Sequence, residues 1–228
     1  MLPAKRQNAA VNNSAIGRAL ARFKTERKEA ARRRPAGIGF LIDATSSRMP
    51  AWAEAQQIQA QMFRSVAGMR ALSLRLVHFG GGSLTDHGWM SSPEKVAATM
   101  RDVRCIAGPT RVLPGLRAFL QHEQPSAIIL VGDCFEENRH EIAAVALDLR
   151  AAGIRVFGFL EGDDAVAAAV FRELAQTTGG RFAWFGAELP LRDLCEGVAL
   201  LTTGGEQAVK RLQNRKVRQL LLTGPAQT

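Results

Sequence analysis

Residues 37–49 read GIGFLIDATSSRM, an apolar run that ends in Asp43 and is followed by three hydroxyl residues. A short apolar run bounded by polar residues is typical of a buried β-strand. The hydroxyls of Thr45, Ser46 and Ser47 could cap a following helix, act as nucleophiles, bind a phosphate or hold a metal ion. Which role applies depends on what the rest of the chain places beside them.

The chain downstream of this run alternates apolar segments with segments of helical periodicity. Further strands are expected at residues 72–79, 87–91, 126–133, 154–161 and 181–185. Helices are expected at residues 50–69, 93–103, 111–123, 137–153, 163–180, 190–201 and 206–222. The alternation predicts an α/β fold, with a doubly wound, mostly parallel central sheet and helices on both faces.

The positive charge of the chain lies at its two ends. The 228 residues carry a net charge of +9, yet residues 1–35 hold ten Lys or Arg against two acidic residues, and residues 204–228 hold five against one. The body between them is mildly acidic. We expect a basic, partly helical N-terminal extension (1–36), a domain (37–203) and a basic C-terminal helix and tail (204–228). The ends could meet nucleic acid or an acidic protein.

Cysteine usage and hydropathy predict a cytoplasmic protein. Cys105, Cys134 and Cys195 are an odd number without C-x-x-C spacing, which argues against a disulfide framework or a zinc knuckle. We expect them to be small apolar core residues in a reducing compartment. Residues 1–36 contain no apolar core of a signal peptide, and no run approaches the roughly 20 apolar residues that span a bilayer. No membrane association is expected.

Polar residues follow the predicted strands where ligands usually bind. In an open parallel sheet, ligands bind beyond the carboxyl ends of the strands, where the strand order reverses. The first strand ends in Asp43, the strand at 126–133 ends in Asp133, and the strand at 154–161 ends in Glu161. A carboxylate in such a position needs a partner for its charge. Three glycines, residues 80–82, follow the second strand and are expected to form a turn.

Several types of site are excluded by missing residues. The chain has no G-x-x-x-x-G-K-[ST] phosphate loop, and no G-x-G-x-x-G follows the first strand. A serine hydrolase would need G-x-S-x-G and a well-placed histidine, and the four histidines lie in ordinary helix or loop settings. A phosphate-accepting aspartate would need a lysine near a later strand end, and the sequence has none there. Ala44 and Thr45 break the D-x-D-x-[TV] pattern of haloacid dehalogenases.

A hard divalent cation is the option that remains. Mg²⁺ prefers carboxylate, hydroxyl and water oxygens. In an extended loop, the alternate residues Asp43, Thr45 and Ser47 can point at one centre, and Thr110 and Asp133 can join them from two later loops. Capping of the helix expected from residue 50 would explain Thr45 and Ser47, but neither Thr110 nor Asp133.

The same residues resemble the motifs of a known family. Residues 43–47, DATSS, resemble the D-x-[ST]-x-S signature of von Willebrand factor A domains. Residues 108–110, GPT, resemble the threonine loop of that family, and Asp133 after residues 131–132 resembles its strand-terminal aspartate. The three pieces occur in order over roughly 90 residues. The chain is similar, more narrowly, to the stand-alone bacterial cytosolic members of this superfamily.

The resemblance implies a metal-ion-dependent adhesion site. One coordination position of the ion would stay open for an Asp or Glu of a protein partner. Two residues depart from the pattern, since Pro109 stands where a second glycine is usual and Cys134 where a glycine often follows the last aspartate. The expected ligands of Mg²⁺ (or Mn²⁺ or Ca²⁺), direct or through water, are Asp43, Thr45, Ser47, Thr110 and Asp133.

These expectations favour a metal-dependent protein-interaction module that is not an enzyme. Nothing in the motif supplies a base, a nucleophile or a leaving-group acid. Two alternatives stay open: a metal-assisted hydrolase or phosphoesterase in the same crevice, and nucleic-acid binding through the basic ends. Glu136 and Glu137 are expected to stabilise the start of the helix at 137–153, or else to tune the charge at the rim of the metal site.

Overall fold

The computed structural model describes residues 22, 36–49, 72–121 and 123–223. The chain divides into two compact units, Met1–Pro35 and Ala36–Thr228, and all described residues except Arg22 belong to the second. The helix expected at 50–69 lies outside the described residues. So does the expected N-terminal extension, apart from Arg22 and Ala36.

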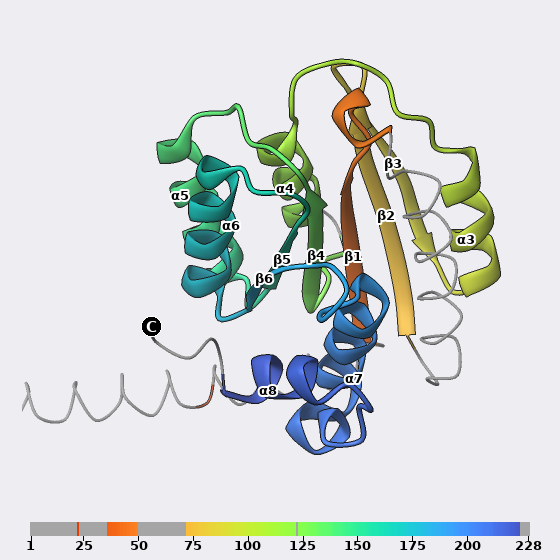
Figure 1. Ribbon diagram of the computed structural model, residues 1–228, viewed down its shortest axis with the longest axis vertical. Coiled ribbons are helices and arrows are strands. Elements are labelled where there is room, and N and C mark those ends of the chain that lie inside the picture. Colours follow the sequence, from red (N-terminus) through yellow and green to blue (C-terminus); the bar gives the residue numbers. More distant parts are fainter. Residues whose placement is uncertain (1–21, 23–35, 50–71, 122, 224–228) are drawn as a thin grey trace, which may run out of the picture. The chain divides into compact units, whose positions relative to one another are not determined.

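A six-stranded, mostly parallel sheet forms the centre of the second unit (Figure 1). The strand order is β3-β2-β1-β4-β5-β6, and among the described strands only the β2–β3 pair is antiparallel. The predicted α/β fold class is therefore confirmed. The strands are β1 (Ala36–Asp43), β2 (Leu72–Gly80), β3 (Ser83–Met90), β4 (Ala127–Gly132), β5 (Arg155–Leu160) and β6 (Phe182–Trp184).

The antiparallel pair is a hairpin that the glycines after β2 close. Gly81 and Gly82 have φ angles of 61° and 73°, the left-handed values that tight hairpin turns require and that glycine adopts without strain. β3 begins at Ser83, earlier than the strand expected at 87–91, because its pairing with β2 starts directly at the turn, with Gly80 opposite Ser83. The expected glycine turn is thus present.

Helices cover both faces of the sheet (Figure 1). α4 (Val112–Leu120), α5 (Arg139–Ala151) and α6 (Ala165–Thr178) lie on one face. α3 (Pro93–Asp102), α7 (Leu191–Val209) and α8 (Arg215–Thr223) contribute to the apolar layer on the other face. None of the helices in the described part of the chain is long and apolar enough to cross a membrane.

Strand alternation divides the hydrophobic core into these two layers. Phe40 and Ile42 of β1 belong to the layer that includes α3 and α7, whereas Leu41 belongs to the layer of α4, α5 and α6. Every residue of β4 is buried, which agrees with its continuous apolar run and with helices on both faces. The buried central strands therefore fix the positions of the residues at their carboxyl ends.

The last two helices complete one of the core layers. α7 continues past residue 203 with a non-helical break at Gly205, whose φ is 66°. Val217 and Leu221 of α8 are buried, and a side chain on Gly197 of α7 would overlap Leu221. Residues after 203 therefore contribute to the same core as the sheet.

Leu221→Ala should lower the free energy of unfolding by about 2–4 kcal/mol, because a leucine that is 3% exposed is replaced by a cavity beside Gly197. Urea unfolding followed by circular dichroism measures the change. Leu147→Ala, at a leucine of α5 that is 60% exposed, is the matched control and should change stability by less than about 0.5 kcal/mol. Equally small losses in both variants would contradict the packing of α8.

Candidate metal centre

The carboxyl ends of β1 and β4 lie where the strand order reverses. From β1 the chain passes outward through β2 and β3, and it then places β4 on the opposite side of β1. Ligands of open α/β sheets bind at this point. Asp43 is the last residue of β1, and Asp133 directly follows β4.

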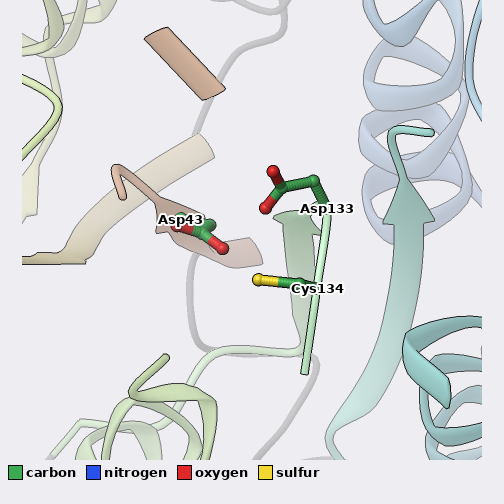
Figure 2. Close-up of side chains that lie close together, drawn as sticks. All are labelled: Asp43, Asp133 and Cys134. Carbon is green, nitrogen blue, oxygen red and sulfur yellow. The ribbon is translucent and has the colours of Figure 1, made fainter. Parts of the chain in front are cut away.

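Figure 2 shows that the side chains of Asp133 and Cys134 both point toward Asp43. One carboxylate oxygen of each aspartate and the Cys134 sulfur lie within 4.8 Å of one another. Asp43 is fully buried, whereas Asp133 and Cys134 are half-buried. Across the described ranges, no other group of three or more His, Cys, Asp or Glu side chains comes as close together.

Each of the two carboxylates has a buried oxygen that lacks a hydrogen-bond partner. Asp43 Oδ1 accepts a hydrogen bond from the backbone N of Thr45 at 2.8 Å. Asp43 Oδ2 and Asp133 Oδ1 have no hydrogen-bond partner within the described part of the chain. Burying such an oxygen without a partner is unfavourable. A cation between the two aspartates would compensate both oxygens at once.

The hydroxyls after Asp43 pair with each other and do not cap the helical turn that follows. Thr45 precedes a short 3₁₀ turn, η1 (Ser46–Arg48), and its side chain makes no capping hydrogen bond. Thr45 Oγ1 instead lies 3.0 Å from Ser47 Oγ. Thr45 is buried and Ser47 is exposed, so the pair runs from the interior toward the surface.

The loop that carries Thr110 is fixed against both neighbouring strand ends. Ile106 N donates to Ala44 O at 3.0 Å, and Gly81 N donates to Ile106 O at 2.9 Å. Gly108 lies so close to the backbone of Gly81 and Gly82 that a side chain would overlap it. The backbone therefore requires glycine in this loop, and the loop reaches the edge of the sheet where Asp43 lies.

Thr110 itself is buried and is bound to the loop after β4. Glu136 N donates to Thr110 Oγ1 at 3.1 Å, and Thr110 N donates to Glu136 Oε2 at 3.1 Å. Val112 N and Leu113 N donate to the two carboxylate oxygens of Glu137 at 2.6 and 2.9 Å. These bonds connect the Thr110 loop to the loop that follows Asp133.

The expected role of Glu136 and Glu137 at the start of the helix that follows them is therefore wrong. Glu137 caps α4, an element that lies earlier in the sequence, because the first backbone N–H groups of α4 point toward it. Asn138 is the N-cap of α5, and its side chain accepts a hydrogen bond from His140 N. The two glutamates connect the loop that follows β4 to the Thr110 loop and to the start of α4.

A buried arginine connects the β1 loop to the end of β5. Arg48 is 2% exposed. Its Nη1 donates to the carbonyl oxygen of Asp43 at 2.9 Å, and its Nε donates to Glu161 Oε2 at 2.9 Å. Arg48 Nη2 also lies 2.8 Å from Glu161 Oε2. The pair places one positive charge beside the aspartates and balances it with Glu161.

Burial raises the pKa of Asp43 to about 6, and the neighbouring charge of Asp133 adds to this shift. Hydrogen bonds from Thr45 and the charge of Arg48 oppose it. Burial also raises the pKa of the Cys134 thiol to about 12, and the carboxylates of Asp133 and Asp43 contribute. Placing negative charge on these neighbouring side chains is therefore unfavourable without a cation.

The arrangement fits a divalent cation in its donor types and in its charge. Two carboxylates with unpaired oxygens come from adjacent strands, and the Arg48–Glu161 pair adds no net charge. Of the five predicted ligands, Asp43 and Asp133 lie together, and Thr45 and Ser47 lie on the same loop as Asp43. The Thr110 hydroxyl bonds to the backbone N of Glu136.

The prediction for the cysteines holds for Cys195 but is wrong for Cys134. Cys195 is fully buried in the core layer of α7. Cys134 faces two carboxylates and is not a core residue, because it lies in the loop that leaves the buried strand β4. Its place directly after a strand-terminal aspartate was the one sequence signal that could have identified it.

Solved structures with the same architecture identify the fold. A von Willebrand factor type A protein from Catenulispora acidiphila matches with a TM-score of 0.59 and 14% identity, over 75% of this chain and 43% of that one. The VWA domain of SpRpn10 matches with a TM-score of 0.57 and 14% identity, over 74% of this chain and 97% of that one. The chain has a von Willebrand factor A-like fold.

A third solved structure with a similar fold contains a metal ion of its own. Proximal thread matrix protein 1 from the mussel byssus, with zinc in its MIDAS motif, matches with a TM-score of 0.55 and 19% identity, over 73% of this chain and 45% of that one. The chain thus spans less than half the length of two of these three proteins. No family model and no curated protein sequence matches the chain.

Any metal binding that uses Asp43 should weaken as the pH falls through about 6. An ion needs the ionised form of Asp43, whose pKa burial raises from 3.8 to about 6. Below that pH, protons compete with the ion, and the apparent affinity should fall about tenfold per pH unit. Titration calorimetry with Mg²⁺ at pH 7.5, 6.5, 5.5 and 5.0 measures the profile. An affinity that stays constant down to pH 5 would contradict it.

The stability of the metal-free protein should change with pH in the opposite sense. Because the pKa of Asp43 is raised in the folded state, protonation of this group favours folding below pH 4, and this contribution is lost as the pH rises through about 6. In EDTA, the midpoint of urea unfolding should therefore shift to higher urea as the pH is lowered from 7 to 5.

Proposed function

We propose that this chain is a protein-interaction module that binds a partner through a divalent cation. The observation that supports the proposal is the pair of buried carboxylate oxygens, Asp43 Oδ2 and Asp133 Oδ1, which have no hydrogen-bond partner among the described residues. They come from the carboxyl ends of β1 and β4, the neighbouring strands at which the strand order reverses and where ligands of open α/β sheets usually bind. The vWA-like neighbours, one of which carries zinc in this type of motif, agree with it.

The ion would be held by oxygen ligands that three loops supply. Asp43 and Asp133 provide the negative charge, and the hydroxyls of Thr45, Ser47 and Thr110 add neutral oxygens, directly or through water. We propose Mg²⁺ as the physiological hard cation to test first. As a Lewis acid, the bound ion would attract an anionic oxygen.

The partner would supply that oxygen from an Asp or Glu side chain. Two protein carboxylates bring a divalent ion close to neutrality, so an additional carboxylate is still attracted. The exposure of Ser47, beside the buried Thr45, gives a partner access to this end of the site. The protein then acts by binding, without a chemical step.

Loss of Mg²⁺ binding in Asp43→Ala is the direct test. Titration calorimetry of the wild-type chain should show one site, and Asp43→Ala should show none. Asp148→Ala, which removes an exposed carboxylate of α5, is the matched control and should bind as the wild type does. Equal binding by Asp43→Ala and the wild type would refute the proposal.

A second experiment tests for the partner. The immobilised protein should retain a protein from lysate in Mg²⁺ and release it in EDTA. Asp43→Ala should fail to retain that protein, whereas Asp148→Ala should retain it. Retention that is indifferent to EDTA and to Asp43→Ala would show that the ion is not part of the interface.

A metal-assisted hydrolase in the same crevice has less support. Two-metal phosphoesterases place two ions about 3.5–4 Å apart and need carboxylates for both. Within the described ranges, Asp43, Asp133 and Cys134 are the one metal-ligand group, and it has two carboxylates. A panel of phosphate esters with Mg²⁺ or Mn²⁺ tests this alternative, and turnover that Asp43→Ala removes would favour it.

A further inference from the structure

Cys134 brings a sulfur atom to the proposed cation site. It follows Asp133 in the loop after β4, and its side chain points toward Asp43 rather than into the core (Figure 2). Its sulfur lies within 4.8 Å of a carboxylate oxygen of Asp43 and of one of Asp133. Asp43 is 0% exposed, and its Oδ2 is buried without a hydrogen-bond partner among the described residues.

The donor set of such a site determines which ion it prefers. Thiolates are soft ligands that bind Zn²⁺ at about 2.3 Å and do not suit Mg²⁺, which takes oxygen ligands. Two carboxylates alone would suit hard cations. Two carboxylates and one cysteine form a mixed set that favours Zn²⁺ or another thiophilic divalent ion over Mg²⁺.

We infer that the Cys134 thiol joins Asp43 and Asp133 as a direct ligand of the proposed ion and makes the site selective for zinc-type ions. The inference rests on the proposed function, because it names the ion that would bridge this chain to a partner carboxylate. On binding, a metal–sulfur bond replaces the S–H bond of Cys134, and the proton passes to solvent. For a tetrahedral ion, Asp43, Asp133 and Cys134 would be the direct protein ligands, and the hydroxyls of the proposed site would act through water. The fourth position would stay open for water or for the partner.

The spacing of the three side chains allows this arrangement after small rotations. In a tetrahedral zinc site the ligand atoms are about 3.5 Å apart, as follows from zinc–oxygen and zinc–sulfur distances of about 2.0 and 2.3 Å. The present separations are within 4.8 Å. Asp133 and Cys134 are neighbours on one loop, so rotation of their side chains can close the site around an ion.

The other two cysteines differ from Cys134 in position and provide controls. Cys195 is buried in the core layer of α7. Cys105 is half-buried and lies outside the group of three ligand atoms. Cys105→Ser is therefore the matched control for Cys134→Ser, since it makes the same chemical change at another partly exposed thiol.

Cobalt spectroscopy and paired titrations test the inference. Co²⁺ bound to the wild-type chain should give the near-ultraviolet charge-transfer band of a cobalt–thiolate bond. Cys134→Ser should lose the band, and Cys105→Ser should keep it. By calorimetry, Cys134→Ser should lower the Zn²⁺ affinity at least about tenfold and change the Mg²⁺ affinity by less than about threefold. Zn²⁺ should also release about one proton more from the wild type than from Cys134→Ser.

The results distinguish failure of the inference from failure of the proposed function. If the wild type binds Mg²⁺ through Asp43, but Cys134→Ser leaves the zinc affinity and the cobalt spectrum unchanged, Cys134 is not a ligand and only the inference is overturned. If the wild type binds neither Mg²⁺ nor Zn²⁺, both are overturned. A cobalt band that Cys105→Ser removes would assign the sulfur elsewhere and would also overturn the inference.

Discussion

Asp43→Asn should abolish metal binding and, at the same time, stabilise the metal-free protein by about 1–2 kcal/mol at pH 7. In the wild type, a buried carboxylate whose pKa is raised to about 6 carries a charge beside Asp133 at neutral pH. The amide has the same shape but no charge. Its oxygen can still accept the hydrogen bond from Thr45 N, and its NH₂ group can donate toward Asp133.

Thermal and urea unfolding, each with EDTA and with saturating Mg²⁺, measure both effects. The wild type should gain stability from the ion, because an ion that binds only the folded state stabilises it by mass action. Asp43→Asn should show no such gain, yet should exceed the wild type in EDTA. Asp148→Asn is the control for removal of a surface charge, and it should match the wild type in both conditions. If Asp43→Asn were less stable than the wild type in EDTA, other groups of the protein would already compensate the charge of Asp43.

Arg48→Met should destabilise the protein by about 3 kcal/mol, the largest loss expected from a single side chain near the site. The substitution leaves the Glu161 carboxylate, which is 26% exposed, without its arginine partner, and it leaves the carbonyl oxygen of Asp43 without its donor. It also removes the positive charge beside two aspartates. Breaking a buried pair by removing one partner is more damaging than losing the attraction alone, because the remaining charge stays desolvated.

A double-mutant cycle with Glu161→Gln separates these contributions. Glu161→Gln keeps a hydrogen-bond acceptor for Arg48 and removes one negative charge, so it should cost less than Arg48→Met. The double variant should be less destabilised than the sum of the single variants, because the unpaired carboxylate is gone. Strict additivity of the two losses would mean that the pair contributes no coupling. Arg117→Met, at an exposed ion pair with Glu141, is the control and should change stability by less than about 1 kcal/mol.

The sheet and its helices were predictable because burial enforces simple patterns. β4 is buried on both faces and reads as a continuous apolar run, and α5 and α6 end where glycines follow. The apolar runs of β1 and β4 end at Asp43 and Asp133, so the sequence alone places both aspartates at strand ends. Parallel strands bring their carboxyl ends to one edge, so two strand-terminal aspartates were expected to approach each other.

The residues around the aspartates were harder to predict, because their roles depend on partners distant in the sequence. Arg48 follows a serine pair in a polar loop, a context typical of a solvated arginine, and its partner Glu161 lies 113 residues later. Glu137 precedes a helix but caps a different one, 24 residues earlier. The local sequence shows which hydrogen bonds a side chain could make. Which partner it has depends on the loops that the fold brings together.

The pairing register of β1 has a kinetic consequence. Its neighbours are β2 and β4, and Ile38 pairs with Ala127, so Asp43 and Asp133 come together only after segments about 90 residues apart have met. Contacts of such long range form slowly. An unfolded chain then holds no binding site, and a divalent ion would act after the rate-limiting encounter. In stopped-flow experiments, such an ion would slow unfolding while the refolding rate stays constant, and so prolong the lifetime of the native state.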